Sequence, residues 1–123
     1  MDKRHLRRIH IVQNLFSWSY QPQKEALPYP EQEKTFKVLE NLKTIDASIE
    51  KYAEKFTLEK IARTDLAILR LGIYELTIEN ELPPKVVIDE AVEIAKELGG
   101  EKSYAFINAV LGKVLENKTN PKI

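Results

Sequence analysis

Cationic and aromatic side chains share the first twenty residues of the chain. Four cations come first and three aromatic residues follow: Lys3, Arg4, Arg7, Arg8, Phe16, Trp18 and Tyr20. Cations neutralise phosphates and aromatic rings stack on unpaired bases, so this combination is typical of a site for single-stranded nucleic acid. The residues leave a second interpretation open, in which the rings belong to the core and the cations only keep the chain soluble.

The distribution of charge supports an anionic partner for this end of the chain. The whole chain is neutral, with 19 Lys and Arg against 19 Asp and Glu. Residues 1–24 contain five of those cations and one acid, a net charge of +4 that the remainder offsets. A basic end on an acidic body favours binding of an anion at that end.

The sequence gives little support for catalysis or for metal or cofactor binding. The chain has no cysteine, and its four glycines form no phosphate-binding loop. His5 and His10 lack the HExxH spacing of a zinc site, which favours a polar surface role for both. Asp89, Glu90 and Glu93 have the chemistry of acid–base groups, but a solvated helix face explains them better. We therefore expect no catalytic residue, no metal site and no cofactor, and a protein that is not an enzyme.

The elements that position the basic residues are predicted to be helices. The six prolines divide the chain into three stretches, and apolar residues recur in each at helical spacing. The first helix ends near Tyr20 and has a broad apolar side. A second, long helix is predicted from Glu31 to Phe56, with a short turn after Thr57. No segment alternates with a period of two, so the fold class is all-α.

The second half of the chain predicts three more helices. The segment Asp65 to Glu79 is apolar on nearly every side and should be central, with Thr64 and Asp65 at its start. Gly72 inside it costs about 1 kcal/mol relative to alanine, which the close approach of another helix would explain. Further helices are predicted over residues 85–98, closed by a pair of glycines, and over residues 102–115, followed by a polar tail.

The length and hydropathy of the chain predict one compact domain over residues 1–123. No apolar run of about 18 residues and no signal-peptide pattern occurs. We therefore expect a soluble, cytoplasmic protein with no membrane partner.

Two segments resemble the NusB family of bacterial transcription antitermination factors. They are RTDLAILRLGIYEL at residues 63–76 and LPPKVVIDEAVEIAKELGGEKSYAFINAVLGKV at residues 82–114. The start, RRIHIVQNLFSW, is similar to the basic first helix of the family, whereas residues 21–56 carry little of the resemblance and look shorter. The resemblance implies a compact bundle of about six to seven helices in two packed subdomains, without enzymatic activity.

The resemblance also implies partners. Members of the family bind the single-stranded boxA element of ribosomal RNA leader transcripts together with NusE, and the assembly helps RNA polymerase pass terminators. By position, the implied RNA-binding residues are Lys3, Arg4, Arg7, Arg8, Gln13, Phe16, Lys102 and Phe106. The implied partner-binding residues are Asp65 and Arg70. Many relatives have tyrosine at the position of Phe16 and an acid at that of Lys102, which implies a changed RNA preference.

Two other interpretations remain open at this stage. One is a helical protein-interaction module that lacks specific RNA recognition, and the other is the targeting domain of a larger RNA methyltransferase. The sequence also leaves open whether free chains hide the basic surface in a homodimer, and whether NusE is obligatory.

Overall fold

The computed structural model describes residues 2–119, and these residues form helices, turns and loops without a strand. The elements in chain order are α1 (Lys3–Tyr20), η1 (Lys24–Ala26), α2 (Lys34–Glu40), α3 (Leu42–Tyr52), η2 (Leu58–Lys60), α4 (Arg63–Ile73), η3 (Tyr74–Glu79), α5 (Pro84–Leu98) and α6 (Ser103–Thr119). The predicted all-α fold is confirmed. No helix in this part of the chain is long and apolar enough to span a bilayer.

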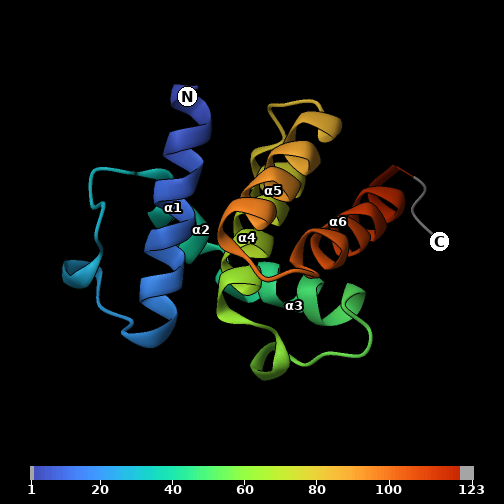
Figure 1. Cartoon of the computed structure of the whole chain (residues 1–123), viewed down its shortest axis with the longest axis horizontal. Helices are drawn as coiled ribbons and strands as arrows, with labels where there is room; N and C mark the ends of the chain where they lie inside the picture. Colours follow the sequence, from blue (N-terminus) through green and yellow to red (C-terminus); the bar gives the residue numbers. More distant parts are fainter. Residues whose placement is uncertain (1, 120–123) are drawn as a thin grey trace.

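Helix α1 lies along one side of the bundle (Figure 1). The carboxylate of Asp2 caps it by accepting a hydrogen bond from the backbone N–H of Arg4 at 2.9 Å. Val12 and Leu15 are buried at its centre. The polar side of α1 is exposed in its first turns, at Lys3, Arg4 and Arg7. Further along this side, Asn14 is buried, and its amide donates to the carbonyl of Tyr29 at 2.8 Å.

The prediction of one long helix from Glu31 to Phe56 is wrong. The structure has two helices there, α2 and α3, which meet at Asn41, where the backbone leaves helical geometry at φ −108° and ψ 15°. The side-chain amide of Asn41 donates to the carbonyl of Lys37 at 2.8 Å and competes with the helical bonding pattern. Helix α3 ends at Tyr52, so Phe56 lies in the loop that follows.

Helix α4 is central, as predicted, and packs against α1, α3, α5 and α6 (Figure 1). All of its residues from Asp65 to Ile73 are buried. A Cβ atom added to Gly72 would lie 3.0 Å from Leu111 Cδ1 on α6, so the predicted close approach of another helix is confirmed. The N-cap is Ala62 rather than Thr64, and no side chain caps this end.

The second half of the predicted central helix is a π-helix, η3, rather than a continuation of α4. The backbone N–H of Asn80 donates to the carbonyl of Glu75 at 3.1 Å, and Asn80 ends the segment in the left-handed region at φ 52°. Lys118 of α6 donates to the carbonyl of Leu76 at 2.6 Å. π-Helical turns occur frequently at functional sites.

Helices α5 and α6 form an antiparallel pair that completes the core. Pro84 begins α5 and Gly99 follows its last turn, as the sequence predicts. Helix α6 continues to Thr119, beyond its predicted end, and the rest of the predicted polar tail lies outside the described residues. The buried apolar residues of α1 and of α3 to α6 form one cluster, so the two predicted subdomains share a single core.

Candidate functional site

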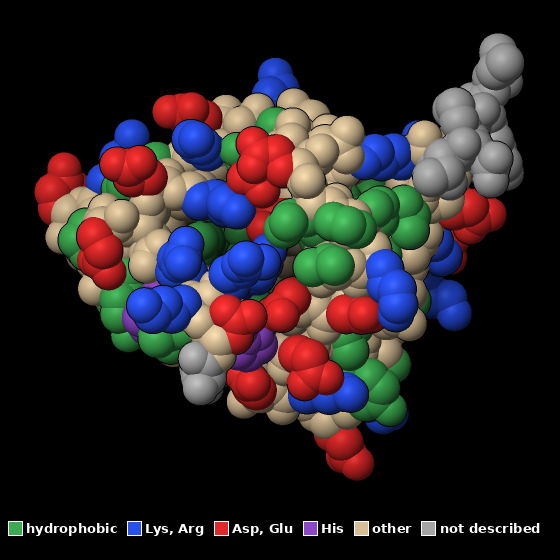
Figure 2. Space-filling view, turned by 90° about the horizontal axis from the view of Figure 1, so that it is seen from above, with side chains coloured by type: hydrophobic (Ala, Val, Ile, Leu, Met, Phe, Trp, Pro, Cys, Tyr) green, Lys and Arg blue, Asp and Glu red, His purple; other side chains and the backbone are tan. Residues whose placement is uncertain are grey.

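The first turns of α1 present three open cations. Lys3, Arg4 and Arg7 are exposed, and none of them forms an ion pair within residues 2–119. Figure 2 views the end of the molecule from which α1 starts and shows Lys and Arg side chains gathered around a hollow. This part of the predicted RNA surface is therefore accessible to an anion.

Arg8, the fourth predicted cation, is turned into the protein. Its side chain is buried, and Nε and Nη2 donate to the two carboxylate oxygens of Glu75 at 3.0 and 3.1 Å. Burial opposes the charge of Arg8, but the hydrogen bonds and the charge of Glu75 outweigh it and raise the pKa of the guanidinium. A bidentate pair of this kind fixes α1 on η3 and leaves Arg8 no open face for RNA.

The ion pair belongs to a network that sequence reasoning missed. Lys34 at the start of α2 donates to Glu75 at 3.0 Å and to Glu79 at 3.1 Å. Glu75 is only 2% exposed and therefore needs both cations. Its position inside an apolar helix was the signal available in the sequence, although its partners lie 41 and 67 residues away.

A second contact joins α1 to α5 through His5. The ring Nδ1 lies 2.6 Å from Glu90 Oε2, and Nε2 lies 3.0 Å from Glu97 Oε1. Carboxylates accept hydrogen bonds, and a neutral imidazole has only one N–H, so the doubly protonated ring is the form that donates to both partners. The hydrogen bonds that the ring donates to Glu90 and then to Glu97 raise the pKa of His5. The predicted polar surface role is wrong for His5, which is 9% exposed.

Gln13 and Phe16 lie on a different flank of α1 from Arg7. Phe16 follows Arg7 by nine residues, which places the two about half a turn apart at roughly 100° per residue. The ring of Phe16 is 38% exposed and meets the ring of Tyr20 edge to face at 5.1 Å. The side-chain oxygen of Gln13 is buried without a hydrogen-bond partner. The predicted RNA residues of α1 thus divide between two flanks.

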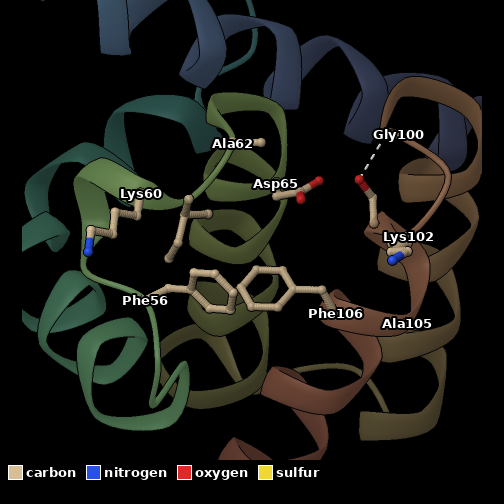
Figure 3. Close-up of a pocket in the computed structure, with 10 residues that line it drawn as sticks. Phe56, Lys60, Ala62, Asp65, Gly100, Lys102, Ala105 and Phe106 are labelled. Carbon is tan, nitrogen blue, oxygen red and sulfur yellow. Dashed lines mark hydrogen bonds between the residues drawn. The ribbon is translucent and has the colours of Figure 1, made fainter.

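Three predicted residues from distant parts of the sequence line one pocket. Asp65, Lys102 and Phe106 meet between the starts of α4 and α6, in an apolar pocket of about 610 Å³ (Figure 3). The ring of Phe106 meets that of Phe56 at 5.5 Å and 81°, and Lys60 lies on the side opposite Lys102. Sequence reasoning missed Phe56, which a long helix would have placed elsewhere.

Asp65 is the polar group inside this pocket. It is 8% exposed, and its Oδ1 atom has no hydrogen-bond partner. Burial raises the pKa of the carboxyl, and a hydrogen bond from Ser103 opposes the rise. The hydroxyl of Ser103 also accepts a hydrogen bond from the backbone N–H of Gly100 at 2.8 Å, which ties the start of α6 to the preceding turn. An unsatisfied acceptor in an apolar pocket can take a donor from a bound partner.

Arg70, the second predicted partner residue, lies apart from this pocket. Its guanidinium donates to both carboxylate oxygens of Asp46 on α3 at 3.0 Å, and the residue is 7% exposed. This geometry gives Arg70 a role in fixing α3 on α4. Within residues 2–119, no group of three or more His, Asp or Glu side chains is arranged to hold a metal ion.

The sequence and the fold both match a known family. The NusB family model matches residues 5–116. The chain is 54% identical over 77 residues to the transcription antitermination protein NusB of Clostridium tetani, and 48% identical over 81 residues to that of Acetivibrio thermocellus. These matches cover 63% and 66% of this chain and 50% and 56% of the relatives, so the chain matches about half the length of each relative.

Solved structures extend the similarity over nearly the whole chain. The NusB of T. maritima is 31% identical, with a TM-score of 0.79 over 94% of this chain and 92% of its own. A crystal structure of antitermination factors NusB and NusE in complex with dsRNA has a TM-score of 0.76, over 94% of this chain and 98% of its own. At 22% identity that second match supports the fold alone. With the family match spanning residues 5–116, the chain belongs to the NusB family.

Proposed function

We propose that this protein is an RNA-binding transcription antitermination factor that binds boxA-like single-stranded RNA of ribosomal RNA leader transcripts together with NusE. The observation that carries the proposal is the pocket in which Asp65, Lys102 and Phe106 meet (Figure 3). Lys102 and Phe106 follow Asp65 by 37 or more positions in the sequence. In the fold, an aromatic ring, a cation and an unpaired acceptor nevertheless lie together.

The chemistry of the side chains assigns phosphate binding and base stacking to different residues. Lys3, Arg4 and Arg7 bind phosphates, which supplies affinity without reading sequence. Phe16 and Phe106 are the rings on which unpaired bases stack. Phe16 has no hydroxyl, so it stacks without the hydrogen bond that a tyrosine would add.

Partner binding is assigned to Asp65, because its buried oxygen gains a donor when NusE docks. Arg8 and Arg70 act as positioning residues, since their guanidinium groups are already held by Glu75 and Asp46. Residues 1–123 work as one binding unit in the cytoplasm, without catalysis, and reach the RNA polymerase antitermination complex through RNA and NusE.

The test is an anisotropy titration of a boxA-like RNA and a scrambled control, with and without NusE, over a range of salt concentrations. We expect boxA to bind more tightly than the scrambled RNA, and NusE to increase the difference. Arg7→Glu should reduce the slope of log K against log salt by about 0.7, the share of one phosphate contact on a single strand. Lys37→Glu, a matched change at an exposed lysine of α2, should leave the slope nearly unchanged.

Two outcomes would contradict the proposal. Equal affinity for both RNAs with retained NusE binding would identify a protein-interaction module without specific RNA recognition. Absence of binding to any RNA, with or without NusE, would remove the RNA function altogether.

A further inference from the structure

A second pocket lies beside α1, on the flank that carries Arg4 and Arg7. Its volume is about 330 Å³, within the range of small-molecule sites. Its walls come from the start of α1, the segment before α2 and the turn between η3 and α5. The lining residues include Arg4, Arg7, Ile11, Lys34, Glu81 and Leu82. Figure 2 faces this end of the molecule.

The floor of the pocket is electrically balanced. Arg8 and Lys34 pair with the buried Glu75, and Lys34 also pairs with Glu79 at 3.1 Å. Two cations and two carboxylates therefore cancel within hydrogen-bond distance. Glu75 and Glu79 both come from η3, whose Leu76 carbonyl also accepts a hydrogen bond from Lys118.

Three charged groups at the rim remain open. The guanidinium groups of Arg4 and Arg7 and the carboxylate of Glu81 are exposed, and none of the three forms an ion pair within residues 2–119. Two open guanidinium groups fit a phosphate. The open carboxylate, however, repels a bare anion and needs a ligand that also brings hydrogen-bond donors.

We propose that this pocket binds a guanosine 5′-phosphate unit. The phosphate pairs with Arg4 and Arg7, and the base lies against the apolar wall of Ile11 and Leu82. Guanine fits Glu81 because its N1–H and N2–H₂ groups are adjacent donors that match the two oxygens of a carboxylate. Adenine and cytosine each offer one amino group on that edge, so they leave one carboxylate oxygen without a donor.

The guanosine unit has two possible sources, a free nucleotide or a residue of bound RNA. For RNA, the inference rests on the proposed function and adds a position at which RNA sequence is read. This position lies on the opposite flank of α1 from Gln13 and Phe16, so an RNA chain that uses both must cross the helix.

The experiment compares GMP, IMP and CMP by nuclear magnetic resonance titration of the backbone amides of α1. IMP lacks only the N2 amino group of GMP, and a hydrogen bond to a charged group is worth about a tenfold change in affinity or more. We expect GMP to bind about tenfold more tightly than IMP. Glu81→Gln should weaken GMP binding about tenfold and reduce its advantage over IMP, whereas Glu50→Gln, at an exposed site on α3, should bind like the unmodified chain.

A second arm uses a boxA-like RNA in which each guanosine is replaced in turn by inosine. We expect one replacement to weaken binding about tenfold, and only in the chain with Glu81 intact. Equal binding of GMP and IMP, or unchanged GMP binding by the Glu81 variant, would overturn the inference. RNA binding without an inosine effect would overturn this reading position but leave the proposed function standing. GMP selectivity without any RNA binding would overturn the proposed function but leave the guanosine site standing.

Discussion

The clearest consequence of the structure is that the docking of α1 depends on the charge of His5. The imidazolium ring joins α1 to Glu90 and Glu97 of α5, at 2.6 and 3.0 Å. These contacts raise the pKa of His5 in the folded protein above the value of about 6.5 expected for the unfolded chain. The stabilisation is therefore complete below about pH 6.5 and is lost as the pH rises through the folded pKa.

The magnitude follows from the exposure of each contact. The His5 side chain is 11% exposed and that of Glu90 26%, so this charge-assisted hydrogen bond is worth about 1.5 to 2 kcal/mol. Glu97 is 41% exposed, and solvent screening reduces its contact to less than about 1 kcal/mol. We expect the pair together to stabilise the protein by about 2 kcal/mol at pH values where His5 is charged.

The assay is urea unfolding followed by circular dichroism at about pH 6, below the pKa of an unfolded-chain histidine, and again at about pH 9. The unmodified chain should exceed His5→Gln in free energy of unfolding by about 2 kcal/mol at the lower pH, and by clearly less at the higher pH. Glu90→Gln should remove most of the pH-dependent difference. Glu93→Gln, an exposed neighbour on α5, should retain it.

A pH-independent difference between the unmodified chain and His5→Gln would refute this reasoning. It would mean that His5 stabilises the helix pair through packing rather than through its charge.

Three further predictions concern single side chains. Arg7→Glu should keep its stability, whereas Arg8→Glu should lose about 3 to 5 kcal/mol in urea unfolding, because it removes one of the two cations paired with the buried Glu75 and places a second carboxylate beside it. Asp65→Asn should raise the free energy of unfolding at neutral pH by on the order of 1 kcal/mol, since it removes a buried charge, and should weaken NusE binding by calorimetry. Gly72→Ala should lower the melting temperature, because overpacking against Leu111 costs about 1 to 3 kcal/mol and exceeds the gain in helix propensity.

Each of these predictions has an opposing result. Equal stability of the two arginine variants would place Arg8 outside the buried pair. Lower stability of Asp65→Asn at neutral pH would show that the carboxylate has a stabilising partner. An unchanged or higher melting temperature for Gly72→Ala would show that Leu111 yields without cost.

Local signals in the sequence predicted much of the fold. Pro84 and Gly99 bound α5 as expected, and the all-round apolar segment from Asp65 is central. The break at Asn41 was not predicted, because α2 and α3 continue nearly the same apolar spacing. Periodicity alone does not reveal a kink at one residue. The π-helical turn was not predicted because apolar spacing does not distinguish it from a continued α-helix, and the Lys118 that bonds to Leu76 is distant in sequence.

The candidate site was predictable by residue type but not by orientation. Arg7 and Arg8 are adjacent and identical in type, yet one is exposed and the other is held by a carboxylate 67 positions away. Phe106 was predicted through family resemblance, whereas Phe56 required knowledge of how the loop after α3 folds back. Sequence pattern identifies which chemistry is present, and tertiary packing decides which side chains remain free to use it.

The most direct test of the proposed function is amide chemical-shift mapping of the intact chain during titration with boxA-like RNA. We predict that shifts concentrate in residues 3–20 and around Lys102 and Phe106, with little change along the exposed side of α3. Shifts confined to other surfaces, with the pocket of Phe56 and Phe106 unaffected at saturation, would contradict the account.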